Sequence, residues 1–326
     1  MLMLMLMNAT VWGLKKTSYK RLDGPQISNW DVLINALDLI WSPTAIGWGH
    51  GVAKRADPRS KSRFLLDRLV SLVVHFLLMD FARFGTEVIG FPFFNRGQRT
   101  IFDPSLAESP FHQYLVASTL TLLFATIAYA GVVLPSDLLA LTGVGLGGSP
   151  HDRWPPAFDR PWARTSLTEL WRKGWHQQAR PALVNFGGRP LALLARAVGV
   201  PTRLGFVLGA FGASALAHVV PALAIAGYKD SWAVAVFFVM QGVGVVLESA
   251  LWWILGWSGE ERKVRLVTKT SMWKKAFGWC WTWGWVLFWG NILVDAWARM
   301  RMTEVDAMMV EESRPARLVY NLFYGS

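Results

Sequence analysis

The stretch GFVLGAFGASALAHVVPALA, residues 205–224, decides the fold class of this chain of 326 residues. Its only ionisable side chain is that of His218. A helix rises about 1.5 Å per residue, so about 20 apolar residues cross a hydrocarbon core of about 30 Å. The stretch therefore predicts a membrane-spanning helix. With it, five segments are long and apolar enough to span, at residues 64–83, 112–134, 204–227, 231–256 and 275–297.

The composition supports an integral membrane protein. Only 17% of the residues are charged, against about 25% in a typical soluble domain. The net charge of +11 would suggest nucleic acid binding by a soluble protein. Here the cations lie in loops between apolar segments, where they set topology and contact lipid head groups, so we expect no nucleic acid partner. The single cysteine, Cys280, excludes an intramolecular disulfide and argues against a cysteine-based metal site.

The loop charges predict the orientation of five crossings. Lys and Arg are abundant in loops 51–63, 135–203 and 257–274 and scarce in the loops between them. The positive-inside rule then places these three loops in the cytoplasm and the C-terminus in the lumen. The sequence thus predicts an all-α, polytopic transmembrane helix bundle, with an amphipathic interfacial helix on a cytoplasmic loop.

The N-terminal part is less regular. We expect a tail over residues 1–29 and a membrane domain over residues 30–326. Residues 30–49 are apolar, but polar side chains and a proline interrupt them. They predict an interfacial or re-entrant segment and no full crossing.

His218 is a candidate functional residue because of its depth in the membrane. An ionisable group near the middle of a span is costly and usually faces the protein interior. Gly205, Gly209, Ala213 and Ala217 recur every four residues, which predicts a ridge for close helix packing. A histidine that only bonds a neighbouring helix remains the structural alternative.

His176 lies in the basic loop 135–203. Ser166 and Glu169 have the spacing of a capping box, so a helix is expected to begin at Leu167. Pro181 is expected to end or kink it. On this helix His176 falls on the polar face. From geometry alone, a solvated histidine on an interfacial helix remains an alternative to a functional one.

One segment of the basic loop resembles the signature of a known family. The segment WPPAFDRPWARTSLTELWRKGWHQ, residues 154–177, is similar to the signature of wax-synthase-like proteins of the membrane-bound O-acyltransferase superfamily. SPTAIGWG at residues 42–49 also resembles a turn of the fungal branch. The resemblance implies that His218 is the catalytic base and that His176 is its partner, at a position where relatives have Asn, Asp or His. Leu170 and Gly174 depart from the signature.

The chemistry expected of these two histidines is transfer of an acyl group. A buried neutral imidazole can take the hydroxyl proton as the alcohol attacks a thioester, and a second group can stabilise the oxyanion. The resemblance implies acyl-CoA as cosubstrate, with no other cofactor and no metal, and a hydrophobic alcohol as acceptor. It further implies a multi-pass protein of the endoplasmic reticulum, in contact with membrane lipids. The candidate substrate-binding residues are Trp171, Arg172, Trp175, Gln177, Ser214, Trp281 and Trp285.

The acceptor is the least determined part. Trp281, Trp285 and Trp289 recur every four residues in the last predicted span, which predicts either packing bulk or a flat aromatic wall beside His218. A flat wall suits a rigid polycyclic molecule, and fungal members that resemble this chain often acetylate terpenoid or related secondary metabolites. We therefore expect acetyl transfer from acetyl-CoA to a terpenoid or meroterpenoid hydroxyl. A long-chain wax or steryl ester synthase is the first alternative. A transporter is the second, disfavoured by the lack of an inverted repeat.

Overall fold

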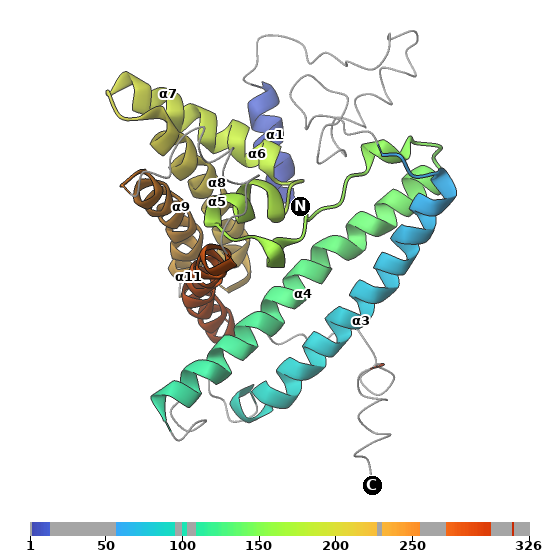
Figure 1. Cartoon of the computed structure of the whole chain (residues 1–326), viewed down its shortest axis with the longest axis horizontal. Coiled ribbons are helices and arrows are strands. Elements are labelled where there is room, and N and C mark those ends of the chain that lie inside the picture. Colours follow the sequence, from blue (N-terminus) through green and yellow to red (C-terminus); the bar gives the residue numbers. More distant parts are fainter. Residues whose placement is uncertain are drawn as a thin grey trace. The chain divides into compact units, whose positions relative to one another are not determined.

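The computed structural model places the described residues in helices joined by loops (Figure 1). It describes residues 2–13, 57–94, 100–102, 109–226, 230–254, 272–300 and 315. The long helices are α1 (Leu2–Gly13), α3 (Lys61–Phe94), α4 (Pro110–Gly145), α8 (Thr202–Ala226), α9 (Ser231–Ile254) and α11 (Met272–Arg299). The short ones are η2 (His151–Arg153), η3 (Pro161–Ala163), α5 (Leu167–Glu169), η4 (Leu170–Gly174), α6 (Arg180–Leu183), η5 (Val184–Gly188) and α7 (Arg189–Ala197). The predicted all-α class is confirmed, and no strand occurs in these residues.

Each of the five predicted spans lies on a long helix, namely α3, α4, α8, α9 and α11. Three of these, α4, α8 and α9, are long and apolar enough to cross a membrane. This finding confirms a membrane protein. Crossing by α3 and α11 stays a prediction. The segment at residues 30–49 lies outside the described residues.

Two of the described helices extend well beyond the predicted spans that they contain, and α3 continues from residue 83 to Phe94. The second span was expected to end at residue 134, but α4 continues to Gly145 with Pro135 inside it. Proline removes one backbone donor, and a membrane helix can accommodate this loss when nearby hydroxyls adjust. Pro135 leaves the carbonyl of Gly131 without its usual backbone donor, and the hydroxyl of Ser136 donates to the neighbouring carbonyl of Val132 at 2.8 Å. The following loop is therefore shorter than residues 135–203.

The chain forms two compact units, each assembled from three chain segments. Unit 1 contains residues 1–58, 152–220 and 238–282. Unit 2 contains residues 59–151, 221–237 and 283–326. Both histidines of interest, His176 and His218, belong to unit 1. The boundaries of the predicted tail and membrane domain stay a prediction.

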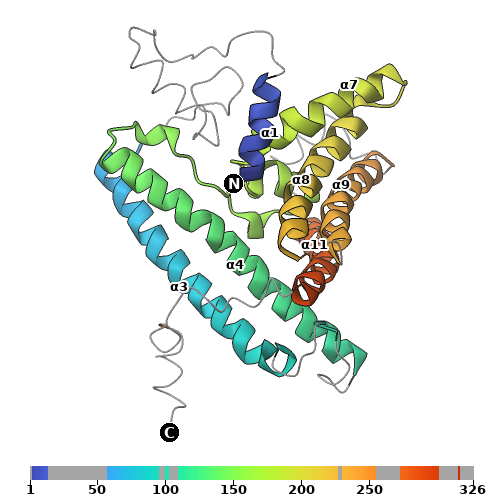
Figure 2. The same cartoon turned by 180° about the vertical axis from the view of Figure 1, so that it is seen from behind.

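In unit 2, α3 and α4 lie side by side as an antiparallel pair in both views (Figures 1 and 2). A buried ion pair joins them, with Arg68 Nη1 at 2.6 Å from Asp137 Oδ1. The hydroxyl of Ser71 donates to the other oxygen of Asp137 at 2.6 Å. His75 lies one turn further, with Nε2 at 3.3 Å from the hydroxyl of Tyr129. Breaking a buried ion pair is strongly destabilising, so this polar cluster fixes the register of the two helices.

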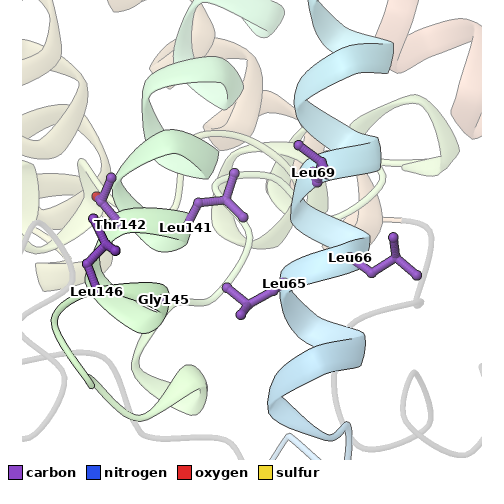
Figure 3. Close-up of a pocket in the computed structure, with 7 residues that line it drawn as sticks. All are labelled: Leu65, Leu66, Leu69, Leu141, Thr142, Gly145 and Leu146. Atoms are coloured by element: carbon purple, nitrogen blue, oxygen red, sulfur yellow. The ribbon is translucent and has the colours of Figure 1, made fainter.

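The same helix pair has an open apolar groove near its end (Figure 3). Figure 3 shows Leu65 and Leu69 on the side of α3 toward the last turns of α4, and Leu66 on the other side. None of the predicted site residues lines this groove, which consists of Leu65, Leu66, Leu69, Leu141, Thr142, Gly145 and Leu146. We therefore assign it no part in the chemistry below.

In unit 1, the small-residue ridge of α8 packs as predicted. Gly205, Gly209, Ala213 and Ala217 are all buried. A Cβ added at Gly209 would lie 2.3 Å from the carbonyl oxygen of Gly187, so the backbones of α8 and η5 touch directly. Helices pack this closely in membranes where both contribute small residues. The N-terminal helix α1 also joins this core through Met7, which is buried among alanines that include Ala213 and Ala217.

Candidate active site

Two short backbone segments of the signature pair with each other and form the frame of the site. The N–H of Asp159 donates to the carbonyl of Gly174 at 3.0 Å, and the N–H of Gln177 donates to the carbonyl of Ala157 at 2.9 Å. The side chain of Phe158, between the two bonded residues of its segment, is buried. Its ring meets His176 edge-on, with 6.0 Å between the ring centroids. The segment from 154 to 177 therefore forms one local structure that holds His176.

The helix predicted to start at Leu167 does so. Ser166 is its N-cap residue, and the serine side chain accepts from the N–H of Glu169 at 3.0 Å. This is the serine half of the predicted capping box. The residue before the N-cap packs closely on α11, because a Cβ added at Gly278 would lie 2.4 Å from the carbonyl oxygen of Thr165.

The predicted end of this helix is wrong. It ends at Gly174, seven residues before Pro181, and its last turn is a π-helix. The N–H of Trp175 donates to the carbonyl of Leu170, five residues back, at 2.8 Å. Gly174 permits the close approach of the frame, since a Cβ there would meet Arg164 at 3.0 Å and Pro161 at 3.3 Å. His176 therefore lies beyond the helix and not on its polar face.

His176 has an unusual backbone and a defined tautomer. Its φ is +36°, in the left-handed region that His, Asn and Asp adopt more readily than most residues. The N–H of Ala179 donates to its Nδ1 at 3.2 Å. An N–H can only donate, so Nδ1 holds the lone pair and, in the neutral ring, Nε2 carries the hydrogen. His176 therefore presents a donor at Nε2.

The environment of His176 keeps its ring neutral. Burial is the main cause that lowers the pKa of His176 below its ordinary value of 6.5. A hydrogen bond to the backbone of His176 itself partly opposes this shift, and the charge of a protonated His218 lowers the pKa further. His176 and His218, 42 positions apart in the sequence, both belong to unit 1.

His218 has the opposite tautomer. Its Nδ1 lies 2.7 Å from the backbone carbonyl of Ser214. A carbonyl can only accept, so Nδ1 carries the hydrogen and Nε2 holds the lone pair. The ring stacks on Phe238 of α9, with 4.0 Å between centroids and 26° between planes. This stack and the bond to Ser214 fix the direction of Nε2.

One expectation for His218 needs correction. The sequence predicted a ring that faces the interior, but its side chain is exposed within the described residues. The buried ridge ends at Ala217, and the next residue points about 100° away around the helix. Phe238 covers one face of the ring.

Two of the predicted substrate-binding residues, Trp175 and Gln177, flank His176 in the loop. Trp171 meets Trp175 edge-on at 6.1 Å and Phe211 of α8 at 5.7 Å. The indole N–H of Trp171 is buried and has no acceptor within the described residues. The amide of Gln177 donates to the carbonyl of Trp175 at 2.8 Å, so this residue supports the loop. The backbone of Ser214 holds His218, as described above.

Two cations lie close together beside this loop. Burial lowers the pKa of Arg180, and the nearby positive charge of Arg172 lowers it further. Both side chains are exposed to some extent, and no acidic partner is found for either among the described ion pairs. Like charges held together without an acid are suited to an anionic ligand. From the sequence, Arg180 was only one of the cations in loop 135–203, and it was not among the predicted substrate-binding residues.

The tryptophan ridge on α11 is divided between the units. Trp281 belongs to unit 1. Trp285 and Trp289 belong to unit 2, where their rings contact each other at 6.1 Å. Trp279, two residues before Trp281, donates its indole N–H to the carbonyl of Trp162 at 2.8 Å. This bond connects α11 to the signature loop. An aromatic wall beside His218 stays a prediction.

Comparison with known proteins identifies the class. Residues 154–240 match the membrane-bound O-acyl transferase family. The matched segment contains the frame, both histidines and the stacking partner Phe238. This similarity, together with that of the two proteins described next, supports a membrane acyltransferase that resembles this family.

Two fungal proteins are similar over most of the chain. Acetyltransferase ataH of Aspergillus terreus is 27% identical over 265 residues, which cover 76% of this chain and 84% of that protein. Acetyltransferase aurG of Calcarisporium arbuscula is 24% identical over 249 residues, which cover 74% of this chain and 58% of that protein. The chain thus spans little more than half the length of the second relative.

Proposed function

We propose that this acyltransferase moves an acetyl group from acetyl-CoA to a hydroxyl of a hydrophobic acceptor, with His218 and His176 as the catalytic pair. The observation that carries this proposal is the opposite tautomers of the two rings. His218 offers a lone pair at Nε2, and His176 offers a hydrogen at Nε2. Acyl transfer to an alcohol needs one group of each kind.

The reaction follows from these two groups. Nε2 of His218 takes the hydroxyl proton as the alcohol oxygen forms a bond to the thioester carbon. The carbonyl oxygen gains negative charge, and the Nε2–H of His176 donates a hydrogen bond to it. The C–S bond then breaks, and the CoA thiolate takes the proton from His218. The products are the ester and free CoA, and both imidazoles return to their starting forms.

The donor is supported by charge and by the relatives. CoA is polyanionic, and Arg172 and Arg180 are two neighbouring cations beside the His176 loop. Both similar fungal proteins carry the name acetyltransferase. We extend that donor to this chain and place the enzyme in the endoplasmic reticulum membrane, with the signature loop on the cytoplasmic side, where acetyl-CoA is available.

The acceptor is proposed to be a terpenoid or meroterpenoid hydroxyl of secondary metabolism. The support is the number of flat indole rings on α11, which suit a rigid polycyclic hydrocarbon more than a flexible chain. Trp281 and Trp285 are the proposed wall residues. Palmitoyl transfer to a fatty alcohol or a sterol is the competing outcome.

A competition assay tests donor and acceptor together. Membranes that contain the enzyme receive equal concentrations of acetyl-CoA and palmitoyl-CoA with farnesol, ergosterol or hexadecanol, and the esters are counted by mass spectrometry. We expect acetyl esters to dominate over palmitoyl esters, and the rigid polycyclic ergosterol to accept more acetyl groups than the flexible farnesol and hexadecanol. Dominant palmitoyl esters of hexadecanol or ergosterol would replace the proposal with a wax or steryl ester synthase.

A substitution of His218 tests the base. His218→Ala should lower the rate of transfer by at least about 100-fold, the lower range for loss of a positioned general base. The exposed neighbour Leu216 on the same helix provides the control, and Leu216→Ala should leave the rate unchanged. A His218→Ala protein that is present in membranes at the normal level and fully active would remove His218 from the mechanism.

A further inference from the structure

Glu248 is a buried carboxylate on α9 that contacts the signature loop. It is 1% exposed. Its Oε1 accepts from the backbone N–H of Leu167 at 2.8 Å. Its Oε2 accepts from the backbone N–H of Thr168 at 3.0 Å and from the hydroxyl of Thr168 at 2.7 Å. One side chain of a membrane helix therefore receives three hydrogen bonds from two consecutive loop residues.

These bonds complete the start of the helix that leads to His176. The first backbone N–H groups of a helix have no partner inside the helix. Ser166 accepts from the N–H of Glu169, the third helical residue. Glu248 accepts from the first and second, Leu167 and Thr168. In a buried place each of these donors would otherwise lack a partner, so the helix start is fixed to α9.

The same helix also holds His218. Phe238 stacks on the His218 ring, and Glu248 lies ten residues further along α9, about 15 Å at the rise of a helix. Between Glu248 and His176 the chain runs through the helical segment that ends at Gly174. A single rigid helix thus contacts one histidine directly and the support of the other.

We propose that Glu248 is a positioning residue for acyl transfer, which sets the place of His176 relative to His218 by anchoring the start of the helix before it. This inference rests on the proposed roles of the two histidines. Glu248 does not touch the reacting atoms. Its carboxylate is suited to the task because both oxygens only accept, whereas an amide has a single accepting oxygen and an NH₂ group that would face other donors.

The test compares isosteric substitutions at two buried carboxylates. Glu248→Gln keeps the size of the side chain and removes at least one of the three bonds. Asp137→Asn is the matched control in unit 2, where the carboxylate is fully buried and accepts from Arg68 and Ser71. Each variant is assayed in membranes with acetyl-CoA and farnesol, ergosterol or hexadecanol, and rates are expressed per folded molecule.

We expect Glu248→Gln to lower kcat on the order of 10- to 100-fold, the range for a catalytic group displaced by about 1 Å. The KM for acetyl-CoA should change much less. Glu248→Asp, which keeps two accepting oxygens, should recover part of the rate. Asp137→Asn should lower the amount of folded protein and leave kcat per folded molecule unchanged.

A double substitution separates positioning from general stability. In a His176→Leu background, Glu248→Gln should cause no further loss of kcat, because the group that it positions is absent. A full additional loss in that background would overturn the inference. So would a Glu248→Gln enzyme with normal kcat.

Hydrogen exchange gives a readout that does not need the substrate. In Glu248→Gln the amides of Leu167 and Thr168 should exchange faster, and in Asp137→Asn they should not. Unchanged exchange would also overturn the inference. If the unsubstituted enzyme forms no ester from acetyl-CoA or palmitoyl-CoA with any of the three alcohols, the proposed function fails. The exchange result still decides whether Glu248 anchors the loop.

Discussion

Two glycines three positions apart on α8 provide a controlled test of the packing that places His218. A Cβ added at Gly209 would lie 2.3 Å from the carbonyl oxygen of Gly187 and 2.7 Å from the Cβ of Leu191. A Cβ added at Gly212 would meet nothing within 4 Å. Gly209→Ala and Gly212→Ala therefore make the same chemical change on the same helix in opposite environments.

The expected magnitudes follow from these distances. Replacing a helical glycine by alanine gains about 1 kcal/mol from backbone entropy, and Gly212→Ala should show this gain. Gly209→Ala must first separate the two backbones by about 1 Å, because an ordinary contact between carbon and oxygen is about 3.3 Å. Overpacking of this kind costs about 1–3 kcal/mol. The entropic gain is common to both variants, so we expect them to differ by about 1–3 kcal/mol, with Gly209→Ala the less stable.

Thermal unfolding of the detergent-solubilised protein measures the difference. Gly209→Ala should also lose activity, because separation of α8 from η5 moves His218 against the loop that carries His176. Equal melting temperatures for the two variants would refute the direct backbone contact between α8 and η5. A stable but inactive Gly209→Ala protein would show that the contact matters for geometry more than for stability.

Two further predictions concern His176. His176→Asn should keep much of the activity, because Asn tolerates a left-handed backbone and its side-chain oxygen can accept from the N–H of Ala179. His176→Leu should lose most of the activity. Equal rates of the two variants in an ester assay would mean that His176 has only a surface role. Because the pKa of His176 is lowered from 6.5 in the folded protein, the unfolded chain binds a proton first as the pH falls. Stability should therefore decrease as the pH drops below about 6.5 and level off below the pKa of His176 in the folded protein. His176→Asn should lack this decrease in melting scans between about pH 7.5 and pH 5.5. Identical pH dependence of the melting temperature in both proteins would contradict this prediction.

The parts of the fold that depend on local pattern could be predicted from the sequence. The small-residue ridge of α8 was visible because glycine and alanine recur every four residues. The start of the helix at Leu167 was visible because Ser166 and Glu169 have capping-box spacing. Both signals involve residues within one helix, so no knowledge of the tertiary neighbours was needed.

The parts that depend on tertiary contacts could not be predicted. The helix ends at Gly174 because the frame around Ala157 and Asp159 takes up the backbone of the following residues. The partner of Glu248 lies 80 residues away in the sequence, so no local spacing indicated it. The direction of His218 depends on Phe238, for which the sequence gives no periodic signal.

The backbone at His176 limits which residues can serve there. A positive φ is costly for most side chains and less so for Asn, Asp and His. These are the three residues that the family resemblance implies at this position. All three can also accept from the N–H of Ala179, since each has an accepting atom near the place of Nδ1. The positive φ and the hydrogen bond from Ala179 therefore limit this position to His, Asn and Asp. The need for a hydrogen-bond donor then favours His among the three. Of the three, only the imidazole presents a second ring nitrogen, Nε2–H, on the far side from that bond. A chain that uses His at this position can place a donor at the thioester carbonyl while the other ring nitrogen still holds the loop, and we expect no other residue to do both.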